Sequence, residues 1–292
     1  MSAKVVGTHT GRIGIVAALI VACTFAPFLP GQYDPAALAF SFAAHVFGVV
    51  GLVLVPIGAA WFIYELRRRA ALSAGRPVKD RGPAFALTAL IVSSIVGAIA
   101  CLSAAMESLG IGVALLILGA FGLVAGIRRL RRLRTSEGDR CLLAAPLYLI
   151  VIPALVALAQ FMVGEGAVES SRNTAMRNAS ELIEEVERYK EVNGGYPDSM
   201  IALYPDYSTG VIGIPQYHYE PAGDAYNLSF EQFRFLPFGT REVVVYNPLD
   251  EHAAISHAAW RLTDADLTDP EMQGWYAAHD SPLPHWRYFW FD

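Results

Sequence analysis

The acidic residues near the end of the chain are the first group with the chemistry to bind a metal. Asp264, Asp266 and Asp269 lie close together and could offer carboxylate oxygens to calcium. An EF-hand loop beginning at Asp264 needs glycine at position six and an acidic residue at position twelve, but those positions hold Asp269 and Trp275. We therefore expect solvated acids and helix caps here, with these three residues as the candidates if calcium binds, and no resident cofactor.

The histidines and serines do not form a recognisable catalytic motif. His252 and His257 are five residues apart, which misses the i,i+4 spacing that places two zinc ligands on one helix face. The sequence has no G-x-S-x-G elbow, phosphate loop or dinucleotide fingerprint. An enzyme would need His, Asp and Ser side chains from residues 200–292 to converge in a cleft. A non-enzymatic protein is the expectation, with that enzyme as an alternative.

Four aromatic side chains near the end of the sequence could form a binding surface: Trp286, Tyr288, Trp290 and Phe291. Large aromatic residues contribute strongly both to protein cores and to interfaces. Core and edge packing is the expected role, whereas an exposed cluster would make a docking patch for another protein.

Two polar residues inside apolar segments are candidates for a membrane cavity. Transport chemistry usually requires ionisable or polar groups at membrane depth, where they are costly to place. His45 lies early in one apolar segment and Gln160 lies near the end of another. They could form part of a small-molecule transport or sensing site, although an interfacial histidine facing headgroups or a neighbouring helix is the expected role.

The elements that carry these residues are mostly apolar. Of the 292 residues, 54% are apolar and 17% charged, against about 25% charged in an average soluble domain. Five apolar segments have nearly the length of about 20 residues that spans a bilayer, and none has a charge in its middle: 13–30, 39–64, 84–104, 110–127 and 141–163. The sequence therefore predicts an α-helical membrane bundle of five spans over residues 1–163.

The basic residues predict the orientation of that bundle. Residues 1–163 carry a net charge of +8, and residues 164–292 carry −13. Two arginine-rich links, 65–83 and 128–140, alternate with links that hold no Lys or Arg. The positive-inside rule places the basic links and the N-terminus in the cytoplasm, and the acidic domain outside. At a membrane boundary such clusters set topology and contact anionic lipid, so we expect a bilayer partner and no nucleic acid.

The segment before Cys23 is similar to a bacterial lipoprotein signal, in which the cysteine would be cleaved at and lipidated. Four further spans already anchor the chain, so we expect Cys23 to lie inside an ordinary span. Either outcome leaves the acidic domain outside.

Residues 164–292 predict a small α+β domain. An amphipathic helix to about residue 192 has an apolar stripe and ends at Asn193-Gly194-Gly195, because glycine accepts the left-handed C-cap conformation. Alternating segments 217–220 and 226–230 predict a β-hairpin with a five-residue loop. Segment 243–246 is apolar on both faces and so central, and 285–291 is a candidate last strand. The stripe consists of Ala175, Ala179, Leu182, Ile183, Val186 and Tyr189.

Residues 170–232 resemble the bacterial pseudopilins and type IV pilin-like proteins. The resemblance rests on a long helix that follows a span and on the phrase Tyr189…Asn193-Gly194-Gly195-Tyr196-Pro197-Asp198-Ser199-Met200-Ile201-Ala202-Leu203, followed by a meander. It implies a pilin-like antiparallel sheet, an extracytoplasmic packing or assembly module and a bacterial source. Some pseudopilins bind calcium in a C-terminal loop, which is the context for the three aspartates above.

The sequence departs from pilins ahead of the last span. A prepilin leader ends in Gly and is followed at the fifth position by Glu, whereas Leu143 stands five residues after Gly138. Four spans also precede this point. We therefore predict an inner-membrane scaffold protein in which the domain at 164–292 binds another envelope or secretion-system protein, while the spans anchor the chain and could form a homo-oligomer. The alternative is a transport or sensing component with a cavity near His45 and Gln160.

Overall fold

The computed structural model describes residues 3–135, 144–203, 206–235, 240–255, 261–263, 266 and 276–291. The calcium candidates Asp264 and Asp269 lie outside the described residues. The chain divides into two compact units. The helical unit comprises Met1–Phe25 and Pro35–Met162, and the sheet unit comprises Ala26–Asp34 and Val163–Asp292.

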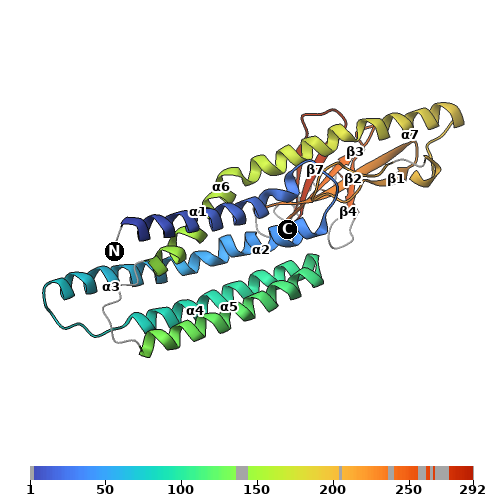
Figure 1. The fold of residues 1–292 in the computed structure, drawn as a ribbon. Helices are drawn as coiled ribbons and strands as arrows, with labels where there is room; N and C mark the ends of the chain where they lie inside the picture. Colours follow the sequence, from blue (N-terminus) through green and yellow to red (C-terminus); the bar gives the residue numbers. More distant parts are fainter. Residues whose placement is uncertain are drawn as a thin grey trace. The chain divides into compact units, whose positions relative to one another are not determined.

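The helical unit contains helices α1 (Ala3–Phe25), α2 (Pro35–Val50), α3 (Leu54–Ser73), α4 (Gly82–Glu107), α5 (Leu109–Thr135) and the first part of α6 (Ala144–Asn178), as Figure 1 shows. In the described chain, five helical stretches are long and apolar enough to cross a membrane. Each of the five predicted apolar segments overlaps one of these stretches over most of its length, which confirms that they are largely helical. Residues 29–30 of the first segment lie past its helical stretch, and residues 141–143 of the last lie outside the described residues.

Helices α2 and α3 belong to one apolar stretch that is interrupted by a 3₁₀ segment, Gly51–Val53. The interruption lies just before Pro56, whose ring would clash with the carbonyl of Leu52 in a regular α-helix. A 3₁₀ turn is a common response to such a conflict. Pro56 is therefore accommodated by a local change of helix type.

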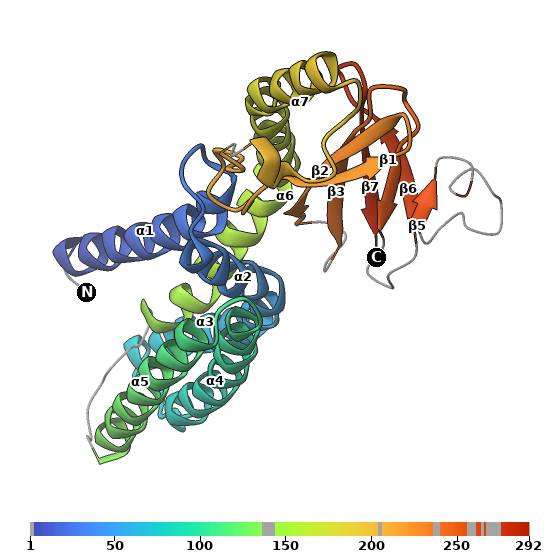
Figure 2. The same cartoon turned by 90° about the vertical axis from the view of Figure 1, so that its right-hand side faces the viewer.

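The sheet unit contains an antiparallel sheet of five strands among the described residues, in the order β1-β2-β3-β7-β6 (Figure 2). The strands are β1 (His218–Ala222), β2 (Ala225–Phe233), β3 (Arg241–Tyr246), β6 (Tyr276–Asp280) and β7 (Trp286–Phe291). A separate pair joins β4 (Ala253–Ile255) to β5 (Arg261–Thr263). The predictions of a central strand at 243–246 and of a last strand at 285–291 are confirmed.

The hairpin between β1 and β2 has a two-residue turn, so the predicted five-residue loop was wrong. Pro221 and Ala222 continue β1 and pair with Tyr226 and Ala225. Proline is tolerated in β1 because this is an edge strand, which does not need every N–H for a ladder bond. Gly223 takes the positive φ of 63° that the tight turn requires.

One face of the sheet packs against the second part of α6 and against α7 (Ser180–Asn193). Of the predicted apolar stripe, Ala175, Ala179, Leu182 and Val186 are buried in this core and Ile183 packs against it, whereas Tyr189 is not one of its members. Alternate residues of the strands supply the other side. Its buried members are Ala175, Met176, Ala179, Leu182, Val186, Met200, Val211, Ile214, Tyr217, Tyr226, Leu228, Phe230, Val244 and Trp286. Val243, Val245, Phe289 and Ala254 form a smaller cluster on the opposite face.

The end of α7 follows the sequence closely. Gly194 has φ 78° and its N–H bonds to the carbonyl of Lys190, which terminates the helix in the left-handed conformation. The chain then returns through Tyr196, whose ring packs edge-on against Tyr226 with centroids 4.9 Å apart. The Tyr196 hydroxyl donates to the Glu187 carboxylate at 3.1 Å. The tyrosine therefore fixes the exit from the helix.

Residues Ala26–Asp34, which connect α1 to α2, belong to the sheet unit. Their backbone pairs with residues 210–213 through Gly31 N–H to Gly210 O at 2.9 Å, Ile212 N–H to Leu29 O at 3.0 Å, and Gly213 N–H to Pro27 O at 2.7 Å. The sequence has no period or motif that predicts this pairing, and by position the segment falls within the predicted membrane anchor.

Gly213 is the tightest point of this pairing. A Cβ atom at Gly213 would lie 2.6 Å from the Cβ of Pro27 and 2.8 Å from its carbonyl oxygen. We predict that Gly213→Ala lowers the free energy of unfolding by about 1–3 kcal/mol, because a crowded backbone cannot yield cheaply. Gly195→Ala is the matched control, since nothing lies within 4 Å of its Cβ position. Thermal unfolding of the full chain in detergent micelles tests this, and equal midpoints for the two variants would contradict it.

Candidate functional site

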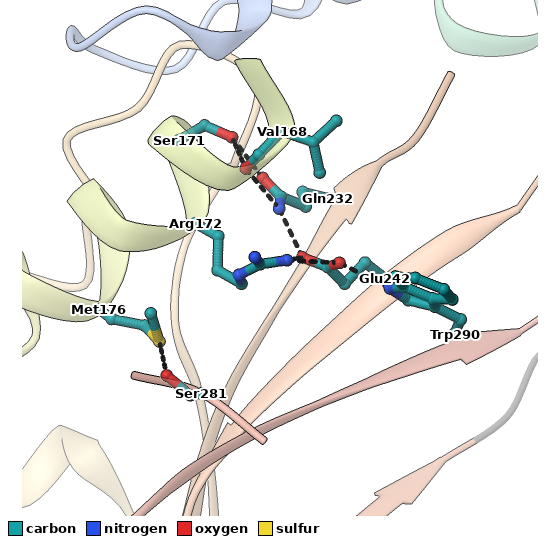
Figure 3. A network of polar contacts seen from close by, with 8 residues as sticks. All are labelled: Val168, Ser171, Arg172, Met176, Gln232, Glu242, Ser281 and Trp290. Carbon is teal, nitrogen blue, oxygen red and sulfur yellow. Dashed lines mark hydrogen bonds and ion pairs between the residues drawn. The ribbon is translucent and has the colours of Figure 1, made fainter. Parts of the chain in front are cut away.

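The most elaborate polar site of the sheet unit is a buried ion pair between helix α6 and strand β3 (Figure 3). Nη1 of Arg172 donates to both oxygens of Glu242, at 2.9 Å and 2.8 Å. The Glu242 side chain is fully buried and Arg172 is nearly so. Two charges in such an environment are tolerated only when they are paired and hydrogen-bonded.

Strand register explains why the partners of Glu242 lie beside it. Gln232 on β2 is directly opposite Glu242, and Trp290 on β7 is directly opposite on the other side. The Gln232 amide donates to Oε1 at 2.7 Å and the Trp290 indole donates to Oε2 at 2.8 Å. Residues paired across a ladder lie on the same sheet face, so the three side chains form a row toward α6.

Helix α6 covers this row of side chains and contacts it through Ser171 and Val168. Ser171 donates to the Gln232 carbonyl oxygen at 2.5 Å, and Gln232 donates in turn to the backbone carbonyl of Val168 at 3.1 Å (Figure 3). Glu242 thus accepts four hydrogen bonds, about as many as a carboxylate has lone-pair sites. No lone-pair site of the Glu242 carboxylate is left to accept a hydrogen bond from a substrate. The arrangement is suited to holding the helix on the sheet and not to acid–base chemistry.

Two arginines stack on alternate aromatic residues of β7. The guanidinium carbon of Arg172 lies 3.9 Å from the Tyr288 ring centroid, and that of Arg234 lies 3.5 Å from the Trp290 centroid. The His279 ring also contacts Trp290, with centroids 3.7 Å apart. Burial is the main cause that lowers the pKa of Arg234. Burial, followed by the positive charge of Arg234, lowers the pKa of His279.

The four C-terminal aromatic candidates have different environments. Trp286 is buried in the main core, so it is not available for docking. Tyr288 and Trp290 are half-buried and carry the stacked arginines. Phe291 ends β7, and its side chain lies outside the described residues.

Of the calcium candidates, only Asp266 lies within the described chain. Its carboxylate accepts hydrogen bonds from the N–H and the hydroxyl of Thr263, both at 2.8 Å. These bonds favour the ionised form and lower its pKa. Within the described residues, no group of three His, Cys, Asp or Glu side chains is placed to hold a metal ion.

His45 and Gln160 both lie in the helical unit and both are buried. The Gln160 amide donates to the carbonyl of Ala44, the residue before His45, at 3.4 Å. A Cβ atom at Gly48 would lie 2.7 Å from the amide oxygen and nitrogen of Gln160. The Gln160 amide therefore occupies the space that a side chain at position 48 would need. The glycine at this position allows Gln160 to approach helix α2.

Two histidines of the sheet unit, His252 and His285, join two tight turns. Nδ1 of His285 lies 3.0 Å from a carboxylate oxygen of Asp250, and both residues have positive φ, 63° and 60°. The His252 ring bridges the same turns through the carbonyls of Asp250 at 3.1 Å and His285 at 3.0 Å. These contacts support left-handed conformations that non-glycine residues rarely adopt.

In the described part of the sheet unit, the buried charged residues Arg172, Arg234 and Glu242 are missing from the candidates that the sequence predicts. Arg172 continues the apolar stripe of α6 and α7 one turn toward the span, and Glu242 alternates with Val244 and Tyr246 on one face of β3. A charged residue in an apolar period is the signal that the sequence offers. In the helical unit, Arg68 is also buried and lies 3.7 Å from the fully buried Glu65 carboxylate. Its place in a basic link predicts only a role in topology and lipid contact.

Comparisons with known proteins add no relative: no family model, no curated protein and no solved structure matches the chain.

Removing one partner of the Arg172–Glu242 ion pair should destabilise the fold. We predict that Arg172→Met lowers the free energy of unfolding by about 3–5 kcal/mol, because the Glu242 carboxylate remains buried without its partner. Arg241→Met is the control, since its pair with Glu231 is exposed and such pairs contribute about 0–1 kcal/mol. Adding Glu242→Leu to Arg172→Met should recover part of the loss. Chemical unfolding in micelles measures all three, and equal costs for the two single variants would refute the assignment.

The depressed pKa of His279 predicts acid sensitivity. The folded protein holds the neutral ring more strongly than the unfolded chain does. The resulting stability is present above about pH 6.5, the unfolded value, and decreases as the pH falls below it. We expect His279→Gln to flatten the dependence of the unfolding midpoint on pH between about 7.5 and 5.5, relative to the exposed control His218→Gln. Parallel pH profiles for both variants would rule out this effect.

Proposed function

We propose that the chain is a bacterial inner-membrane protein whose sheet unit is an extracytoplasmic, pilin-like interaction domain. The domain binds an envelope protein or a second copy of the chain and has no catalytic role. The observation that carries this proposal is the pairing of Ala26–Asp34 with residues 210–213. It ties the link between the first two apolar helices to the domain that follows the fifth.

The exterior of the helical unit supports insertion in a bilayer. Large apolar side chains point outward along α4 and α5, with Phe121 71% exposed and Leu118 65% exposed. A soluble bundle would bury such residues, whereas hydrocarbon solvates them. Five apolar stretches of sufficient length in the described chain support the same conclusion.

The parity of the spans supports the orientation. The link at Ala26–Asp34 follows one apolar helix and the sheet unit follows five, so the two emerge on the same side when all five cross. Neither this link nor Ser108, between α4 and α5, is basic, whereas the links at 74–81 and 128–140 are rich in arginine and lysine. The positive-inside rule then assigns the sheet unit to the exterior.

The chemistry of the domain supports binding over catalysis. The Glu242 carboxylate has its hydrogen-bond capacity filled, and the described bonds of His252 and His285 lead to oxygens of neighbouring turns. The long helix, its glycine stop and the packed Tyr196 are the features on which the pilin resemblance rests. Near them, Val192 and Ile201 are apolar and largely exposed, which makes them candidates for a contact surface.

Cysteine labelling tests the orientation. In a chain whose three native cysteines are replaced by serine, Glu184→Cys on α7 should react with a membrane-impermeant maleimide in intact spheroplasts. Lys79→Cys, in the basic link, should react only after permeabilisation, because the bilayer separates it from the reagent. The reverse pattern, or labelling of both positions in intact cells, would overturn the proposed topology.

In-cell crosslinking tests the interaction role. A photo-crosslinking amino acid at Val192 or Ile201 should capture one reproducible envelope protein or a second copy, identified by mass spectrometry. The same amino acid at Asp224, an exposed turn residue, is the control. If a correctly oriented domain yields no product specific to Val192 and Ile201, this surface is not the interaction site.

A further inference from the structure

Arg234 is a buried cation that the ion-pair network does not neutralise. Its side chain follows β2 and only 7% of the residue is exposed. Its Nη1 atom is buried and has no hydrogen-bond partner among the residues that the structure describes. The Trp290 indole covers one face of the guanidinium, with the guanidinium carbon 3.5 Å from the ring centroid. The N–H edge is the part that can bind an anion.

The local charges leave a positive surplus. Glu242 is the fully buried carboxylate near Arg234, and its oxygens are occupied by Arg172, Gln232 and Trp290. Glu165 on α6 lies near enough to act on Arg234 electrostatically, but it is exposed to solvent. Among the described residues of the sheet unit, two buried arginines therefore share one buried carboxylate. An uncompensated buried charge is costly, so a bound anion would relieve it.

His279 provides a second polar group beside Trp290. Its Nε2 atom is buried without a hydrogen-bond partner in the described part of the chain, and its ring contacts the same indole as Arg234. A neutral imidazole can donate a hydrogen bond from Nε2. Arg234 and His279 thus each offer an N–H donor suited to an oxyanion next to Trp290.

The position of Arg234 within the sheet unit indicates where that oxyanion comes from. Its neighbours Phe233 and Phe235 both pack on Phe28, at centroid distances of 6.3 Å and 5.0 Å. Phe28 directly follows the first apolar helix. Phe235 also lies against Gly164, where its ring comes within 2.9 Å of the glycine's Cβ position, just after the apolar part of α6. Arg234 thus lies between two phenylalanines that contact the points where α1 and the apolar part of α6 join the sheet unit.

We propose that Arg234, His279 and Trp290 form a binding site for a phosphate group, supplied by a phospholipid headgroup at the outer surface of the membrane. The site rests on the proposed topology, because phosphates line the bilayer at the level where the apolar helices end. Arginine binds phosphate through its N–H edge, and the stacked indole holds that edge in place. Free phosphate shares this chemistry and is the other source to be distinguished.

The test is thermal unfolding of the full chain in a neutral detergent, with phosphatidylglycerol, phosphatidylcholine or inorganic phosphate added separately. We expect a phospholipid to raise the unfolding midpoint of the wild type by about 3 °C. Arg234→Met should lose this shift and Arg234→Lys should retain part of it. Arg241→Met, an exposed arginine of the same sheet, should keep it in full.

Each outcome decides one question. A shift with phosphate alone would support the oxyanion site and overturn its assignment to lipid. Equal lipid shifts in wild type and Arg234→Met, or no shift in the wild type, would overturn the site altogether. If Arg234→Met does not fold, His279→Gln replaces it and should reduce the shift. The cysteine-labelling assay on the same variants reports topology separately, so failure of the site and failure of the proposed orientation remain distinguishable.

Discussion

The burial of Arg172 and Glu242 between helix α6 and the sheet constrains the rest of the sheet unit. Because both charges are removed from water, their geometry must be met together by the strand register and by the rotation of the helix. Gln232 and Trp290 can complete the network only when β2, β3 and β7 are aligned as observed. The apolar stripe would tolerate some sliding of the helix over the sheet, whereas this pair defines one position.

The same network produces the charge imbalance at the end of the unit. Glu242 is occupied by Arg172, so Arg234 stacks on Trp290 and pairs with no carboxylate among the described residues. The Arg172–Glu242 ion pair thereby leaves the Arg234 guanidinium available to another anion. Arg234 lies between Phe233 and Phe235, which pack on Phe28. Stability and the proposed phosphate site are consequences of one arrangement of charges.

The pairing of Ala26–Asp34 with the sheet unit gives the domain two covalent connections to the apolar helices, one at each end of this segment, in addition to α6. A domain tethered by a single helix could swivel at glycines such as those at 164 and 166. In the structure both glycines lie inside α6. Backbone hydrogen bonds also hold the first link on residues 210–213 of the sheet unit.

The sequence by itself determined the elements that depend on local period and composition. Five apolar helices, the stripe from Ala175 to Val186, the stop at Gly194 and the central strand around Val244 all follow from neighbours in the chain. The tertiary structure alone decided which charges meet, because Arg172 and Glu242 are 70 residues apart and nothing local couples them. It also decided that Trp286 is core while Trp290 carries an arginine, since these roles depend on what α6 and β2 place against β7. The pairing of residues 26–34 with residues 210–213 was likewise decided only in three dimensions, because backbone hydrogen bonds between irregular segments leave no side-chain pattern.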